Sequence, residues 1–267
     1  MPPGNVVPRL ASIRLHPIKS LDPVSVSEAR IGPNGGLELD RVWALYSADG
    51  RWVNGKRTAA IHLIRSAFAR DVSSVTLSVP GDRRKIPART FAFPGDAEGA
   101  AEWLSVYFEQ VIQVRYAREG FPDDGLAPGP TLVSTASLEK VCEWFPQIVL
   151  EEARRRFRTT LEIAGVPAFW EDQLFAASET NVVRFRIGEV AFEGSNPCAR
   201  CPVPPRDSQT GEIVPGFQTL FTQLRRKHFP DWAPYDRFDH FYRLATNTRV
   251  PGTETGKLLR AGDPLIL

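Results

Sequence analysis

The chain has 267 residues, a formal net charge of +2, and a composition of 42% hydrophobic and 24% charged residues. These values are typical of a soluble protein with one large or two smaller domains around a substantial core. The small net charge excludes a globally basic nucleic-acid-binding protein, so we expect no nucleic-acid partner and only a small anion as ligand.

The cysteine count and the N-terminal sequence bear on localisation. Three cysteines are an odd number and Cys142 lies alone in a predicted helix, which argues against a secreted disulfide framework. No apolar run approaches the roughly 20 residues that span a bilayer. The start, Met1–Pro8, lacks the features of a signal peptide. We therefore expect a cytoplasmic protein with no membrane association.

The first half of the chain is predicted to be rich in strands. Alternating apolar residues and the turn sequence Ser-Ala-Asp-Gly predict several strands and one hairpin. The expected strands are Leu10–Leu15, Val24–Ile31, Val42–Tyr46, Trp52–Asn54, Val72–Val79, Arg89–Phe93 and Val111–Tyr116. Between the last two strands, apolar residues at helical spacing predict a helix over Ala97–Gln110, with Asp96 as its N-cap.

The second half follows a polar Gly/Pro-rich stretch, Glu119–Pro130, which is the best linker candidate. We therefore predict two domains, residues 1–118 and residues 119–267. Helices are expected from Ser134 to Trp144 and over Phe217–His228. The expected strands are Thr131–Val133, Arg158–Ile163, Val182–Ile187, Glu189–Phe192 and Pro264–Leu267.

The remaining cysteines form a C-x-x-C motif, Cys198 and Cys201, between a predicted strand and a proline-rich loop. Such a pair can form a redox disulfide, supply half of a zinc site or offer one thiolate to a softer metal, and Arg200 favours the thiolate. The four histidines lack zinc-site spacing, and too many prolines follow for a thioredoxin-like helix. The sequence favours one thiolate on a metal, with the zinc and disulfide alternatives left open.

Several separated motifs resemble the molybdenum-cofactor sulfurase C-terminal (MOSC) family. The second-half motifs are Val182–Phe192, Asn196–Cys201, Arg206–Gly211 and Ala261–Leu267, with Phe157-Arg158 ahead of a strand. The first-half motifs are Leu15–Ser20, Gly35–Leu37 and Leu39–Trp43. These resemble the β-barrel domain that precedes the MOSC domain in the mitochondrial amidoxime-reducing component and its bacterial relatives. The resemblance implies an α+β protein: an N-terminal β-barrel-like domain packed on a mixed β-barrel MOSC domain with peripheral helices.

The same resemblance implies a molybdenum cofactor, a pyranopterin that ends in a phosphate. By position, Cys201 is the molybdenum ligand and the catalytic residue, and Cys198 lies in the cofactor site. Fixed cations and hydroxyl or backbone donors suit the rest of the cofactor. The candidates for this role are Lys19, Ser20, Arg41, Arg158 and, at a predicted helix start, Ser134 and Thr135. The alternative interpretation is that Lys19 and Arg41 are solvated charges and that Ser134 only caps its helix.

Two departures from the family pattern fall near the expected site. The chain has Thr159-Thr160 where relatives have Pro-Asn, and Pro204-Pro205 where relatives have Thr-Thr or Pro-Thr. Both changes concern the substrate pocket and the reaction more than the cofactor, because Lys19, Arg41, Arg158 and Cys201 are all present.

The resemblance implies a reductase that takes oxygen from a small N-hydroxylated or N-oxide substrate. Electrons would come from a separate flavin or iron-sulfur donor protein, and the basic runs 154–156 and 225–227 are candidate docking sites for an acidic donor. The main alternative is a protein that carries the cofactor, or sulfur as a persulfide on Cys201, without turnover of its own. A zinc or thiol-disulfide protein is the third hypothesis.

Overall fold

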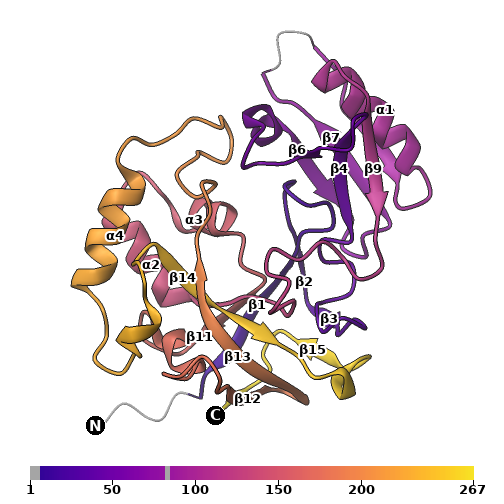
Figure 1. Ribbon diagram of the computed structural model, residues 1–267. Helices are drawn as coiled ribbons and strands as arrows, with labels where there is room; N and C mark the ends of the chain where they lie inside the picture. The colour runs from indigo at the N-terminus through magenta and orange to yellow at the C-terminus, as the bar shows by residue number, and fades with distance from the viewer. Residues whose placement is uncertain (1–6, 82–84) are drawn as a thin grey trace.

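The protein has two lobes, seen at the lower left and upper right of Figure 1. The computed structural model describes residues 7–81 and 85–267, so the start on which the signal-peptide prediction rests lies partly outside the described residues. The α-helices of the described chain are α1 (Ala97–Phe108), α2 (Thr135–Trp144), α3 (Leu150–Phe157) and α4 (Phe217–Lys227). None of the helices in these two ranges has the length and apolar character needed to cross a membrane.

The lower lobe is built on an eight-stranded sheet with the strand order β16-β12-β13-β14-β10-β11-β1-β2. Neighbouring strands are antiparallel except for β10 and β11, which are parallel. The strands are β1 (Arg9–Leu15), β2 (Val24–Val26), β10 (Leu132–Ser134), β11 (Leu161–Ala164), β12 (Val183–Ile187), β13 (Val190–Ala199), β14 (Arg243–Arg249) and β16 (Leu265–Ile266).

The two ends of this sheet come together at the start of β1. Arg9 forms an isolated bridge with Pro264, the amide of Leu10 donates to the carbonyl of Asp263 at 2.9 Å, and the amide of Gly262 donates to the carbonyl of Leu10 at 2.7 Å. The sheet therefore curls back on itself. These contacts do not extend into a ladder between named strands of the described chain. The mixed α/β class is confirmed, and the closed barrels stay a prediction.

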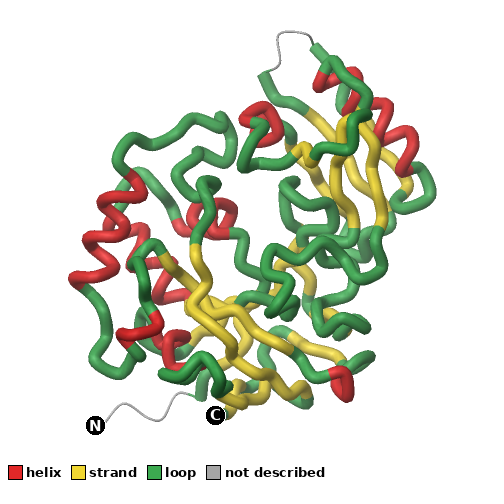
Figure 2. The backbone as a smooth tube through the Cα atoms, viewed as in Figure 1, coloured by secondary structure: helices red, strands yellow, loops and turns green. Residues whose placement is uncertain are grey.

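The upper lobe holds two three-stranded sheets beside α1 (Figure 2). One has the order β5-β4-β9 and the other the order β6-β7-β8, while a two-stranded sheet pairs β15 with β3. The strands are β3 (Glu28–Arg30), β4 (Trp43–Ser47), β5 (Trp52–Val53), β6 (Arg65–Phe68), β7 (Ser74–Ser78), β8 (Arg89–Ala92), β9 (Ile112–Tyr116) and β15 (Leu258–Arg260). Since β15 lies near the C-terminus and β3 near the N-terminus, this pair links the two ends of the sequence.

One apolar core runs through both lobes. It includes Ile13 of β1, Trp43 of β4, Leu104 of α1 and Phe192 of β13, all buried. A second cluster lies under α2, α3 and α4 against the large sheet. Because the lobes share a core, side chains from both halves of the sequence are held in fixed positions around the space between them.

Most predicted elements are present, and the differences have physical reasons. Asp96 caps α1 by accepting from the Gly99 amide at 3.2 Å, as expected. Arg158 does not begin a strand: it is the C-cap of α3, an eight-residue helix that the sequence analysis did not predict. The buried strand β14 was also missed, because its Thr246 and Thr248 read as polar loop residues. Both hydroxyls are buried because they donate to backbone carbonyls.

The predicted boundary between residues 118 and 119 is crossed by the large sheet. Strands β1 and β2 precede the boundary, yet β1 pairs with β11 over four residue pairs beginning at Arg9 and Ala164. The first predicted domain therefore contributes β1 and β2 to the large sheet, whose other strands all come from the second predicted domain.

Gly194 tests how closely the elements pack. A methyl group there would lie 1.5 Å from the carbonyl oxygen of Leu174 in the 3-10 helix η2 (Trp170–Leu174), which crosses β13. We expect Gly194→Ala to lower the free energy of unfolding by about 3 kcal/mol or more, measured by urea denaturation. The control is Gly252→Ala, where nothing lies within 4 Å of the added carbon. Equal stabilities of the two variants would contradict this packing.

Candidate functional site

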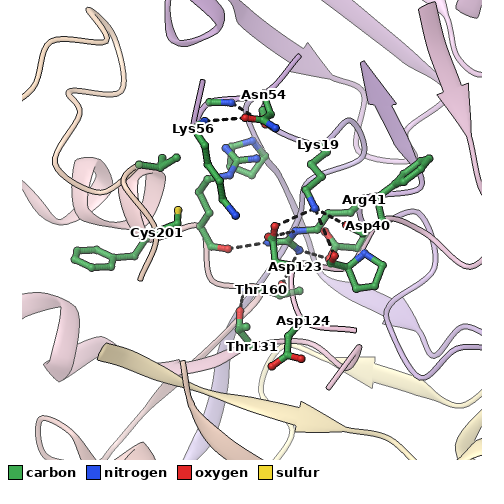
Figure 3. Close-up of a pocket in the computed structure, with 18 of the residues that line it drawn as sticks. Lys19, Asp40, Arg41, Asn54, Lys56, Asp123, Asp124, Thr131, Thr160 and Cys201 are labelled. Atoms are coloured by element: carbon green, nitrogen blue, oxygen red, sulfur yellow. Dashed lines mark hydrogen bonds and ion pairs between the residues drawn. The ribbon is translucent and has the colours of Figure 1, made fainter. Parts of the chain in front are cut away.

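A cavity of about 690 Å³ lies between the lobes, with walls from both halves of the chain and from the linker. The sequence-predicted residues that line it are Lys19, Ser20, Arg41, Arg158, Cys198 and Cys201. Figure 3 shows Cys201 on one side of the cavity and Lys19 and Arg41 on the other. The structure thus brings together residues up to 182 positions apart in the sequence, from Lys19 to Cys201.

Lys19 and Ser20 follow β1 on the N-terminal side of the cavity. The Lys19 amide donates to the carbonyl of Trp43 at 2.8 Å, which fixes this segment against β4. Ser20 has a left-handed backbone (φ 76°), and its hydroxyl accepts from the amide of Gly55 at 3.2 Å. Arg41 and Arg158 also have positive φ values, 54° and 51°. Non-glycine residues adopt this conformation rarely, and such strain often marks functional sites.

The guanidinium of Arg41 is the most connected group in the site. It is paired with Asp40, donates to Thr160 Oγ1 at 3.2 Å and to the carbonyl of Arg158 at 3.0 Å, and lies 3.5 Å from Asp123 Oδ2. Burial would lower the pKa of Arg41, but Asp40 and Asp123 raise it above its ordinary value. Arg41 therefore stays charged and joins segments from both halves.

Lys19 and Asp123 form the second ion pair of the site. Lys19 Nζ lies 2.9 Å from Asp123 Oδ1 and also donates to the carbonyl of Phe121 at 2.9 Å. Burial lowers the pKa of Lys19, and Asp123 opposes this effect. Burial would raise the pKa of Asp123, but Arg41 and Lys19 hold it well below its ordinary value. Asp123 is therefore ionised near neutral pH.

Arg158 is a cation without an anionic partner in the described chain. It is half-buried, and no carboxylate among the described residues lies within ion-pair distance of its guanidinium. Loss of water around this group, together with the charge of Arg41, lowers the pKa of Arg158 to about 10. A cation in this position is suited to bind an anion from the cavity.

The C-x-x-C motif sits at the end of β13, where the strand runs on past the predicted Phe192 to Ala199. All three cysteines of the chain are free, and both cysteines of the motif line the cavity. Arg200 Nη1 donates to Cys198 Sγ at 3.1 Å and its guanidinium lies over the ring of Phe157. No hydrogen bond to the sulfur of Cys201 is found in the described part of the chain. Its thiol is thus the one left available to a ligand.

Ser134 and Thr135 do not line the cavity. Ser134 is fully buried and caps α2, since its hydroxyl accepts from the amide of Ser137 at 3.1 Å. Thr135 donates to Glu162 Oε1 at 2.8 Å. These hydrogen-bonding groups are already satisfied inside the protein. The structure therefore supports the capping interpretation of Ser134 and does not place this pair with the other candidates.

The cavity contains functional groups that the sequence analysis missed. Asp40 follows Leu39 in the quoted Leu-Asp-Arg motif, and Lys56 stands in a turn held by Asn54, whose side chain accepts from the Lys56 amide at 3.0 Å. Figure 3 places Lys56 between Cys201 and the Arg41 side in this view. His62 and Arg206 also line the cavity, and burial lowers the pKa of His62. Of these residues, Asp40 could have been predicted, because it lies within the Leu39–Trp43 motif.

The two departures from the family pattern have different locations. Thr160 lines the cavity and accepts a hydrogen bond from Arg41, so the replacement keeps a polar partner for that guanidinium. Pro204 and Pro205 are buried and do not line the cavity. Their effect on ligands in the cavity can only be indirect.

The basic runs suggested as docking sites are mostly occupied by internal partners. Arg154 donates to both carboxylate oxygens of Glu162, and Arg156 is buried against Glu152 and Asp207. Arg225 is fully buried and paired with Asp172. Because these three arginines are paired with carboxylates inside the protein, they do not form an exposed basic patch. Arg226 and Lys227 of the second run are exposed, and docking of a donor there stays a prediction.

The cavity as a whole is basic. Among the described residues, ten basic and five acidic side chains line it, although the entire chain has a net charge of only +2. The basic residues are Lys19, Arg41, Lys56, Arg57, Arg65, Arg155, Arg156, Arg158, Arg200 and Arg206. The acidic residues are Asp22, Asp40, Glu119, Asp123 and Asp124. Concentrating positive charge in a concave site attracts anions.

Comparison with known protein families gives two matches along the chain. Residues 7–110 match the family described as "MOSC N-terminal beta barrel domain", and residues 131–265 match the "MOSC domain". The second match covers half of the chain. It includes Arg158 and both cysteines of the motif, while the first includes Lys19 and Arg41.

Curated relatives are distant. The chain is 24% identical over 249 residues to molybdenum cofactor sulfurase of Drosophila ananassae, covering 83% of this chain and 31% of that protein. It is 23% identical to molybdenum cofactor sulfurase of Drosophila grimshawi, covering 82% of this chain and 30% of that protein. The chain thus spans less than a third of the length of these relatives. A solved structure titled "Crystal structure of an hypothetical protein" matches with a TM-score of 0.32 and 15% identity, over 52% of this chain and 50% of that one.

The unpaired charge of Arg158 should be unfavourable when the cavity holds no anion. We expect Arg158→Met to raise the free energy of unfolding by about 1 kcal/mol, because it removes a poorly solvated cation and keeps a flexible side chain. Thermal denaturation in a buffer without phosphate or sulfate measures the change. Arg57→Met is the control, since Arg57 lines the same cavity but is exposed. If Arg158→Met lowers the free energy of unfolding and Arg57→Met does not, the guanidinium of Arg158 has a stabilising partner and the prediction is wrong.

Glu171, next to the Ser137 hydroxyl, gives a pH dependence. Burial, and secondarily the charge of Asp172, raise the pKa of Glu171 from 4.5 to about 7 in the folded protein. The unfolded chain loses this proton at a lower pH than the folded protein, so the free energy of unfolding should fall between about pH 4.5 and about pH 7. We expect Glu171→Gln to remove about 2 kcal/mol of this fall, measured by urea denaturation across the range. An unchanged pH slope would show that Glu171 does not titrate as inferred.

Proposed function

The chain belongs to the MOSC domain family, which is linked to molybdenum cofactor sulfuration or binding, and we propose that it binds this cofactor in the cavity and works as a reductase. The observation that carries the proposal is the pairing, in one basic cavity, of a free thiol at Cys201 with an unpaired cation at Arg158. A cofactor that contains both a thiolate-binding metal and an anionic phosphate would contact both groups.

The donors of the cavity fit such a ligand. In the described chain, the Nε atoms of Arg200 and Arg206 are buried without a hydrogen-bond partner, and both residues line the cavity. Buried donors without partners are unfavourable, so a bound group that draws these two side chains towards the cavity would satisfy them. The excess of basic over acidic lining residues suits a ligand that ends in a phosphate.

Each residue has a distinct role in this proposal. The thiolate of Cys201 would ligate molybdenum, since soft metals favour sulfur ligands. Arg158, with Lys19 and Ser20, would hold the phosphate, and Arg41 would position Arg158 through its hydrogen bond to that residue's carbonyl. Cys198, held by Arg200, would lie beside the cofactor without ligating the metal.

When bound, molybdenum cofactor supplies a two-electron redox centre that accepts an oxygen atom. The family includes molybdenum-dependent reductases, and we propose a small N-hydroxylated or N-oxide substrate. Around it, Lys56 and His62 would face the cavity as polar groups, with His62 mostly neutral near pH 7 because its pKa is lowered by burial. Electrons would come from a separate flavin or iron-sulfur protein.

The similarity to two molybdenum cofactor sulfurases favours a second candidate. In this alternative the chain holds the cofactor, or a persulfide on Cys201, and does not reduce a substrate itself. The two candidates share the site and differ in turnover. A fold alone does not decide between them.

The thiol assignment can be tested by replacing each cysteine of the motif. We expect Cys201→Ser, made in a molybdenum-replete host, to lose at least about 90% of its molybdenum, because the alcohol is a much poorer ligand than a thiolate. Elemental analysis and oxidised-pterin fluorescence measure the metal and the pterin. Cys198→Ser is the matched control and should keep most of both.

The outcomes separate the candidates. Wild-type protein without molybdenum, or a Cys201→Ser variant that keeps it, would rule out the proposed ligand. Molybdenum-loaded wild type that reduces an N-hydroxylated amidine with an added reductase supports the reductase. Loaded protein that reduces none of the N-hydroxylated and N-oxide substrates, or that carries thiol-labile sulfur on Cys201, supports the second candidate.

A further inference from the structure

We infer that the carboxylate of Asp123 occupies the place where a phosphate group binds, and that it must leave Lys19 and Arg41 when that group binds. The inference rests on the proposed function, because it names the internal competitor of the same site. Asp123 lies in the linker at residues 119–129 of the cavity wall, and Figure 3 shows it against Lys19 and Arg41.

Lys19 has no hydrogen left for another anion while Asp123 is in place. A lysine ammonium has three donors. In the structure Lys19 Nζ contacts Asp123 Oδ1 at 2.9 Å, the carbonyl of Phe121 at 2.9 Å and the carbonyl of Pro122 at 3.5 Å. All three contacts come from the linker. A phosphate oxygen can reach Lys19 only if one of these contacts is given up.

Of the two acids near Arg41, Asp123 is the more easily displaced. Its side chain is 58% exposed, and exposed ion pairs contribute little to stability. The other acid near Arg41, Asp40, differs: its side chain is 10% exposed and also accepts from the amide of His16 at 2.7 Å. Asp40 is therefore a fixed part of the site, whereas Asp123 can turn outward.

The backbone on both sides of Asp123 is anchored, so a side-chain rotation is enough. On one side the amide of Phe121 donates to the carbonyl of Arg41 at 2.8 Å. On the other side Asp124 accepts from the amide of Leu126 at 2.9 Å and from Asn247 at 3.0 Å. The linker can keep its path while the Asp123 carboxylate moves.

The charge balance agrees with displacement. Three cations, Lys19, Arg41 and Arg158, face two carboxylates, Asp40 and Asp123, and Lys56 also lines the cavity. A phosphate monoester carries a charge of about −1.5 to −2 near neutral pH. With Asp123 in place these three cations have a surplus of one charge. Removal of its carboxylate raises the surplus to two, which matches the phosphate.

The experiment measures the binding of inorganic phosphate to cofactor-free protein by titration calorimetry. We expect Asp123→Asn to lower the dissociation constant about tenfold relative to wild type, which corresponds to about 1.4 kcal/mol. Asp124→Asn is the matched control: it removes the same charge from the neighbouring position, but Asp124 contacts no cation of the site. Its dissociation constant should change less than about twofold, because long-range charge effects alone are weak in salt.

Equal or weaker phosphate binding by Asp123→Asn, or equal gains in both variants, would overturn the inference. A crystal structure of the wild-type protein with bound phosphate provides a second test, which does not depend on whether a variant folds. Phosphate on Lys19 with Asp123 more than about 4 Å away, beyond ion-pair distance, supports displacement. Phosphate elsewhere, or beside an unmoved Asp123, refutes it. These readouts are independent of molybdenum: tighter phosphate binding in a protein that never contains the metal would sink the proposed function and leave this inference standing.

Discussion

The guanidinium of Arg41 determines how the two halves of the protein meet. It lies in the N-terminal half and binds Asp40, the hydroxyl of Thr160 and the carbonyl of Arg158, which caps α3 in the C-terminal half. A buried cation that loses such partners is strongly unfavourable. The position of the turn before β4, the end of α3 and the approach to β11 are therefore coupled, and together they form one wall of the cavity. The anion binding that we propose at Arg158 and the packing of the lobes therefore depend on the same set of contacts.

Much of the site could be predicted from the sequence because its key residues stand in motifs with a fixed order. Lys19, Ser20, Arg41, Arg158, Cys198 and Cys201 all line the cavity although they come from distant segments. What the sequence could not give was the local conformation of these residues. Arg158 reads as the start of a strand by its neighbours, but it ends a short helix in a left-handed conformation. That helix is stabilised by ion pairs such as the one between Arg156 and Glu152. A search for apolar residues at helical spacing does not detect such a helix.

The residues that were misplaced or missed depend on contacts between distant segments. Ser134 looks the same in sequence whether it caps a helix or binds a ligand, and only the buried environment of its hydroxyl decides for the cap. Asp123 lies in a polar, proline-rich stretch that predicts a linker and nothing more. Its ion pair is with Lys19, more than a hundred residues earlier in the sequence. Similarly, the threonines of β14 can be buried because their hydroxyls donate to the carbonyls of Glu171 and Pro130. These carbonyls lie in distant segments, so the sequence of β14 alone does not reveal them.

The strand β1 has a consequence for how the chain can fold. It is nearly the first described segment, yet it pairs with β11 and its first residue bridges to Pro264 near the C-terminus. The entropy lost on closing a loop must be compensated before contacts of such long sequence separation become favourable, and chains rich in them fold slowly. During synthesis β1 has to wait for Pro264, which is made much later. The large sheet, and with it the wall that carries Cys201, can be completed only after the residues of β16 have been made.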